Sequence, residues 1–237
     1  WDEMAVIFVN TPSLFTFIPA QGQNHMVVSE YRPEAVRLAY LNLLRSTGDD
    51  HLSSREAVVL REFPIESSLF KHDVAPYVGK IIARHGLEEW KACLLTNELH
   101  RHLGMYSIIG AKMGVRAREI LDAPFDTLKV VSKAGSLPPL SCMNDGLQVS
   151  TGASLGRGAI HVTEGLNAPA AVFIHEKKGL TLELKDEVAR RVRDDIAAAL
   201  KEYGGLTQEY FAHIRRLSVD YWFDLDRKEI FDESLEA

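Results

Sequence analysis

The chain has 237 residues, 46% of them hydrophobic, and a formal net charge of −6. A chain of this length can bury a large core, roughly three quarters of the surface that its unfolded form exposes. The acidic balance argues against a nucleic-acid partner. Two cysteines are too few for a secreted disulfide scaffold, so we expect a reducing, cytoplasmic location.

The first segment, Met4 to Ala20, is apolar, but polar residues and a proline interrupt it at residues 10–13. It has neither the positive start of a signal peptide nor the roughly twenty apolar residues of a spanning helix. We therefore expect no membrane association. We assign residues 1–30 to an extension without a catalytic role and residues 31–237 to a single domain, with its core at residues 70–220.

Helical patterns dominate the next part of the chain. Pro33 is placed to begin a helix, and Gly86 to end one in a left-handed conformation. Apolar residues at helical spacing predict amphipathic helices over residues 34–45, 74–84, 87–99 and 105–121.

The segment 105–121 is the most distinctive of these. Gly110 and Gly114 each cost a helix about 1 kcal/mol relative to alanine, so together with Ala111 they indicate that another backbone approaches closely. Its charged residues predict a polar face: Lys112, Arg116, Arg118 and Glu119.

From Phe125 onward the pattern changes to short runs rich in Val, Ile, Leu and Thr, separated by Gly and Pro. Helices return at 185–201 and, with Thr207 as N-cap, at 207–219. We therefore predict an α+β fold, with a mixed or antiparallel sheet core and helices at both ends. The predicted strands cover residues 128–132, 147–150, 159–163, 170–175 and 180–184.

Two histidines lie in the motif HRHLG at residues 100–104. At a spacing of two residues, His100 and His102 point apart on a helix but to one side of an extended segment. They can therefore share a metal only if the preceding helix ends near Leu99, in a tight connection to the next helix. Otherwise they are ordinary histidines, one buried and one exposed.

The cysteine of interest is Cys142, which lies between Pro138-Pro139 and Asn144-Asp145-Gly146. Both flanks predict irregular structure, so we expect Cys142 to sit in a turn and to be reachable as a ligand or nucleophile. Asp145 is either part of its chemistry or only a residue that forms the turn.

A glycine-rich segment, TGASLGRG at residues 151–158, matches neither the phosphate loop nor the dinucleotide fingerprint. We interpret it as a turn or crossover. Ser150, Thr151 and Arg157 remain candidates for polar contacts with a substrate or cofactor.

Taken together, residues 99–185 resemble the FmdE family, which takes its name from a component of formylmethanofuran dehydrogenase and includes bacterial relatives. The order and spacing of several segments carry this resemblance: HRHLG at 100–104, IGAKMG at 109–114, CMNDGLQVSTG at 142–152 and ASLGRG at 153–158.

The resemblance implies an α+β homodimer in which the histidine and cysteine motifs meet at a metal-binding cleft. His102 and Cys142 are then the first ligand candidates, followed by His100, with Asp145 beside them. Zinc suits imidazole and thiolate ligands best, with nickel or iron as alternatives. An oxidoreductase partner is also implied.

Two positions depart from the family pattern. Arg101 stands between the histidines where a glycine is common, and Gly104 stands where a cysteine is common. The lost cysteine weakens any dithiol mechanism, and Arg101 places a cation that could lower the pKa of Cys142 or hold an anion. Paired C-x-x-C motifs are absent, so no structural zinc module is expected.

These observations leave three hypotheses. The first is a metal site that acts through polarisation of a carbonyl or through bound water, with Cys142 and Asp145 as catalytic residues. The second is an accessory or carrier protein that serves an oxidoreductase with a metal or a pterin-type cofactor. The third is a metal-free thiol enzyme that uses Cys142.

Overall fold

The computed structural model describes residues 15–20, 26–31, 33, 36 and 57–236. They fall into two units, Trp1–Ser53 and Ser54–Ala237. In the first unit, β1 (Phe15–Pro19) and β2 (Met26–Tyr31) pair in antiparallel orientation. The helix predicted over residues 34–45 lies almost entirely outside the described residues.

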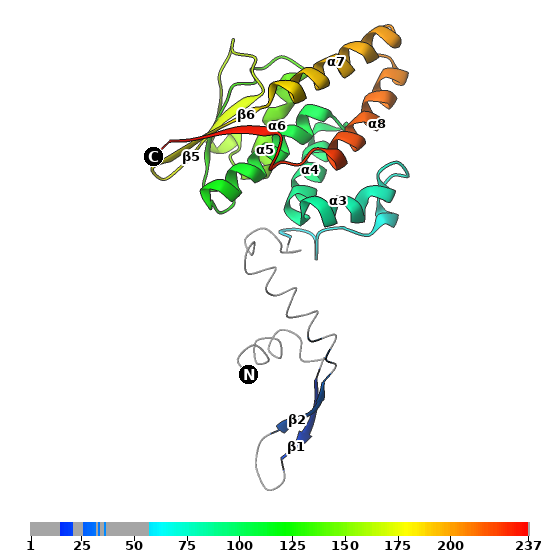
Figure 1. The fold of residues 1–237 in the computed structure, drawn as a ribbon, viewed down its shortest axis with the longest axis vertical. Coiled ribbons are helices and arrows are strands. Elements are labelled where there is room, and N and C mark those ends of the chain that lie inside the picture. Colours follow the sequence, from blue (N-terminus) through cyan, green and yellow to red (C-terminus); the bar gives the residue numbers. More distant parts are fainter. Residues whose placement is uncertain (1–14, 21–25, 32, 34–35, 37–56, 237) are drawn as a thin grey trace. The chain divides into compact units, whose positions relative to one another are not determined.

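The second unit combines helices with a five-stranded sheet (Figure 1). Its helices are α3 (Val78–His85), α4 (Leu87–His100), α5 (Met105–Leu121), α6 (Met143–Thr151), α7 (Asp186–Glu202) and α8 (Gln208–Asp224). Its strands are β3 (Lys129–Ser132), β4 (Ile160–Val162), β5 (Ala170–His175), β6 (Lys178–Leu184) and β7 (Phe231–Glu236). Short 3-10 turns are η2 (Ser67–Leu69), η3 (Ala75–Tyr77), η4 (Leu140–Cys142) and η5 (Leu155–Arg157).

The sheet has the strand order β4-β3-β5-β6-β7. Strands β3 and β4 are parallel, and the other neighbours are antiparallel, with Phe173 opposite both Val130 and Leu180. The predicted α+β class with a mixed sheet is therefore confirmed. Thr207 also caps α8 as predicted, since its hydroxyl accepts the backbone N–H of Tyr210 at 3.2 Å.

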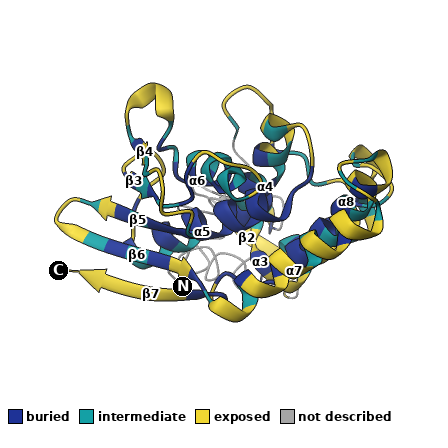
Figure 2. Cartoon of the chain, turned by 90° about the horizontal axis from the view of Figure 1, so that it is seen from above, coloured by how far each residue is buried: buried dark blue, intermediate teal, exposed yellow. Residues whose placement is uncertain are grey.

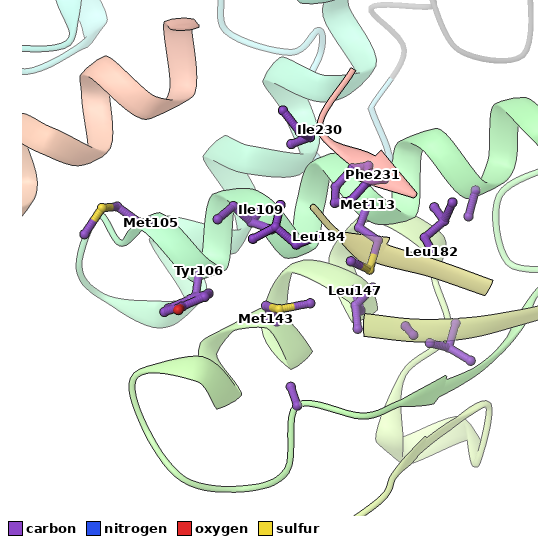
Figure 3. Packing of buried hydrophobic residues seen from close by; sticks show 14 of the residues in the cluster. Met105, Tyr106, Ile109, Met113, Met143, Leu147, Leu182, Leu184, Ile230 and Phe231 are labelled. Atoms are coloured by element: carbon purple, nitrogen blue, oxygen red, sulfur yellow. The ribbon is translucent and has the colours of Figure 1, made fainter. Parts of the chain in front are cut away.

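Helix α5 is the central element and is buried along most of its length (Figure 2). One of its faces, including Ile109 and Met113, packs with the sheet, as Figure 3 shows for Leu182, Leu184 and neighbouring side chains. The opposite face, including Ile108, packs with α3, α4 and α8. The helix thus separates two hydrophobic cores and fixes everything attached to its ends.

Helices α5 and α6 pack backbone to backbone. A Cβ atom at Gly110 would lie 2.3 Å from the carbonyl oxygen of Met143, and one at Gly146 would lie 2.3 Å from the backbone nitrogen of Ala111. Real Cβ atoms do not approach so closely, so only glycine fits at either position. The close approach predicted from the small residues of α5 is therefore confirmed.

The predicted turn at residues 144–146 and the predicted strand at residues 147–150 are wrong, because both lie in α6. The buried residues Met143, Gly146, Leu147 and Ser150 recur at helical spacing. Packing against α5 therefore overrides the turn preference of the Asn-Asp-Gly sequence. Gly152 ends the helix in the left-handed conformation, at φ 77°.

The polar face predicted for α5 is wrong as a solvated surface. Lys112 is fully buried and donates to the carboxylate of Glu89 at 2.5 Å and to the carbonyl of Leu225 at 2.7 Å. Arg227 donates to the second oxygen of Glu89 at 3.2 Å and forms a forked pair with Glu119. The charges instead join α4, α5 and the segment that precedes β7.

Cys93 lies in this interior, as predicted for a core residue, with no exposed surface. Among the described helices, none is both long enough and apolar enough to cross a bilayer.

Candidate metal centre

The connection between α4 and α5 decides where the two histidines lie. Helix α4 ends at His100, and Arg101 adopts a left-handed conformation with φ 66°. Gly104 then returns to extended backbone as the N-cap of α5. The helix therefore ends one residue later than the sequence condition required, and the chain turns sharply between the histidines.

As a result, the rings of His100 and His102 lie on the same side, with centroids 3.9 Å apart. Cys142 approaches them from the junction of η4 and α6, where it is half-buried. One ligand atom from each of His100, His102 and Cys142 can be chosen so that all three lie within 4.8 Å of one another. The fold thus brings together two motifs about forty residues apart in the sequence.

Asp145 lies behind this cluster. Its Oδ2 is 2.7 Å from Nδ1 of His100, a hydrogen bond in which the ring donates to the carboxylate. That bond leaves the lone pair on Nε2, which is buried and has no hydrogen-bond partner among the described residues. A buried acceptor without a partner is costly, and a carboxylate behind a histidine is the usual support of a metal ligand. The donor set therefore fits a divalent transition metal.

Electrostatics also shape the two remaining ligands. Burial, and then the carboxylate of Asp145, raise the pKa of the Cys142 thiol to about 11. Partial burial, and then the neighbouring His100, lower the pKa of His102, which favours the neutral ring that a metal requires.

Arg101 turns away from the thiol. Its side chain is 83% exposed and lies 3.9 Å from Glu98. The expectation that it lowers the pKa of Cys142 is wrong, because the pKa is raised. Its other predicted role, holding an anion, stays a prediction.

The other candidate contact residues make local contacts of their own. The hydroxyls of Ser150 and Thr151 are buried and donate to carbonyls one turn back in α6, those of Gly146 and Leu147. Arg157 donates to the carbonyl of Gly152 and pairs with Asp126. Their predicted contacts with a substrate or cofactor stay predictions.

The sequence reasoning missed Asn97. Its Oδ1 accepts the backbone N–H of Gly104 at 3.1 Å and the hydroxyl of Ser107 at 2.9 Å, while its Nδ2 donates to the carbonyl of Cys93 at 2.7 Å. One amide therefore ties the end of α4 to the start of α5 and holds the histidine connection closed. The available signal was an asparagine inside a helix, where its propensity is poor.

Comparisons with known proteins place this geometry in context. The model of the family described as "FmdE, Molybdenum formylmethanofuran dehydrogenase operon" matches residues 99–230. The probable S-adenosyl-L-methionine-binding protein of Archaeoglobus fulgidus is 26% identical over 200 residues, which are 77% of this chain and 53% of that protein. The chain thus spans about half the length of this curated relative.

Among solved structures, an FmdE-like protein of tungsten formylmethanofuran dehydrogenase from Syntrophus aciditrophicus shares 17% identity with the chain. The alignment covers 68% of this chain and 70% of that one, with a TM-score of 0.35.

Proposed function

Because the chain belongs to the FmdE family, we propose that it binds one divalent transition metal, zinc first, through His100, His102 and Cys142. The observation that carries this proposal is the buried Nε2 of His100, which has no partner among the described residues, while Asp145 bonds the opposite ring nitrogen. A histidine held in this way is arranged as a ligand rather than as a core residue.

Each residue has a distinct part in this proposal. Asp145 fixes the tautomer and orientation of His100 and makes it a stronger donor. Half-buried Cys142 supplies a soft ligand from the interior side, and His102 supplies a ligand from the exposed side. Three protein ligands leave a fourth position of a tetrahedral ion open, as in catalytic rather than structural zinc sites.

The chemistry follows from that open position. A bound zinc ion supplies Lewis acidity, which polarises a carbonyl oxygen or acidifies water. Asp145 has a carboxylate that is 34% exposed, so it can exchange a proton with solvent and with His100. Nickel and iron suit the same ligands and are the alternatives to zinc.

The raised pKa of Cys142 argues against the metal-free thiol enzyme. A thiol with a pKa of about 11 is almost entirely protonated at neutral pH, and the thiolate is the form that attacks. We therefore keep Cys142 as a ligand.

A second candidate function is that of an accessory protein for an oxidoreductase. The family description, which refers to the operon of a molybdenum enzyme, favours it. In that case the metal site, or a cofactor held next to it, serves the partner enzyme, and the oxidoreductase copurifies with the protein from its native host. The homodimer implied by the resemblance also stays a prediction, which sedimentation velocity tests.

The metal proposal is tested by cobalt substitution. Loading the purified protein with Co²⁺ should produce the near-ultraviolet charge-transfer band of a thiolate-bound ion together with visible bands of low-symmetry cobalt. The band should be present in Cys93→Ala, which removes the buried core thiol, and absent in Cys142→Ala. A spectrum of hexa-aqua cobalt in the folded wild type contradicts the proposal.

A further inference from the structure

A cavity of about 560 Å³ opens beside the ligand cluster. His102 and Arg101 line it on one side, and the segment 60–74 lines it on the other. Its volume lies within the range of about 300–1,000 Å³ that is typical of small-molecule sites. Because His102 belongs both to the cavity and to the proposed ligand set, a molecule in the cavity lies next to the metal position.

The walls of the cavity are mostly apolar and partly aromatic. Trp222 lines it and stacks on Trp90, with ring centroids 4.9 Å apart and planes at 15°. Phe70, also in the lining, packs edge-on against Trp90 at 5.1 Å. Such a rigid wall suits a flat organic body, which gains stabilisation from stacking and from the removal of apolar surface from water.

The charged residues in the lining have the sign opposite to that of the whole chain. Three cations, Lys71, Arg101 and Arg215, face one anion, Glu98, although the chain has a net charge of −6. Asp73 neutralises Arg215 through a forked pair at 2.5 and 3.0 Å. Lys71 is exposed, and its ammonium has no ion pair or hydrogen bond with any residue that the structure describes.

We propose that this cavity binds an organic anion with a flat, apolar body, with its acidic group at Lys71 and its body against Trp222. Arg101 adds a second cation at the same opening, which gives a use to the residue that replaces the common glycine. The proposal rests on the proposed function only in one respect: His102 is the point at which the bound anion meets the metal.

The test uses two probes that differ only in charge. Anilinonaphthalene sulfonate has a flat aromatic body and a sulfonate, and phenyl-naphthylamine has the same body without the charge. Both become fluorescent in apolar sites. Binding in this cavity should also quench Trp90 and Trp222, so the titrations are made in a Trp1→Phe background that removes the third tryptophan.

The variants are chosen to change the charge and not the fold. Lys71→Met removes the free cation, Lys71→Arg keeps it, and Lys201→Met removes an exposed lysine of α7 that does not line the cavity. Lys71→Met should weaken sulfonate binding about three- to fivefold, the range expected for one exposed charge contact. Lys71→Arg should restore it, Lys201→Met should leave it unchanged, and the neutral probe should bind all variants alike.

Absence of binding of the sulfonate overturns the proposal. So does sulfonate binding that Lys71→Met and Lys201→Met change equally, or binding without quenching of the two tryptophans. The metal content of each sample is measured separately, and the titrations are repeated after chelation. Charge-dependent binding without any metal would remove the proposed function and keep the cavity; metal without charge-dependent binding would do the reverse.

Discussion

Helix α4 has a polar cluster near each end, and the two clusters differ in how their polar atoms are satisfied. Near its start, Glu89 is fully buried, and both its oxygens accept from cations, Lys112 and Arg227. At its end, His100 has one nitrogen bonded to Asp145 and the other buried without a partner among the described residues. The first cluster is complete and holds the fold together; the second has an open valence and is where we place the metal.

The largest effect is expected from breaking the complete cluster. Glu89→Ala leaves Lys112 and Arg227 as buried charges without their partner, so it should lower the free energy of unfolding by about 3–5 kcal/mol. Urea denaturation measures this. The matched control is Glu233→Ala, which breaks a partly exposed pair with Arg116 and should cost less than about 1 kcal/mol. Equal effects of the two variants would remove the distinction between the clusters.

The next effect concerns the contact that carries Cys142 to the histidines. Gly110→Ala places a Cβ atom against the carbonyl oxygen of Met143, which forces α6 away from α5. We expect a loss of about 3 kcal/mol, the upper part of the range for overpacked positions, together with weaker metal binding.

The control for that variant is Gly79→Ala in α3, where an added Cβ atom meets nothing within 4 Å. It should stabilise the protein by about 0.4–1 kcal/mol, because alanine restricts the unfolded chain. Thermal unfolding of both variants gives the comparison, and a harmless Gly110→Ala would contradict the close approach of the two helices.

A smaller effect is expected from Asp145, which supports the open cluster. Asp145→Asn keeps an oxygen that accepts from His100 but removes the negative charge, so metal affinity should fall about 10- to 100-fold. Competition with a chromophoric chelator measures it. Asp122→Asn, at an exposed left-handed position that asparagine tolerates, should leave the affinity unchanged; an equal loss there would mean that the effect is one of net charge.

The smallest effect is expected from Asn97, which joins the two helices at the histidine connection. Asn97→Ala removes its three hydrogen bonds and should cost about 1–2 kcal/mol of stability, allowing for the solvent that replaces some of them. Hydrogen exchange at the amide of Gly104 should accelerate while the amides of α7 stay protected. Unchanged exchange at Gly104 would show that other contacts hold the connection.

The sequence predicted the helices and most of the strands because their periodicity follows from which faces are buried. It misplaced residues 144–150 because the Asn-Asp-Gly sequence favours a turn locally, while two glycines on facing helices allow a contact that only the fold makes visible. The buried role of Lys112 was missed for a similar reason, since a lysine on a helix is solvated unless a distant carboxylate meets it.

The candidate site was predictable in its members and not in its arrangement. The motif spacing pointed to His100, His102 and Cys142, which the fold does bring together. Their orientation depends on the left-handed turn at Arg101 and on Asn97. The cavity beside them depends on the segment 60–74, which lies far from both motifs in the sequence.

The most direct test of the open cluster is the metal content per chain, measured by inductively coupled plasma mass spectrometry on protein purified without chelators. Wild type and Cys93→Ala should both contain about one transition-metal ion per chain, and Cys142→Ala should contain none, because only Cys142 lies with the two histidines. Folded wild-type protein without metal, or equal metal in Cys142→Ala, would contradict the account.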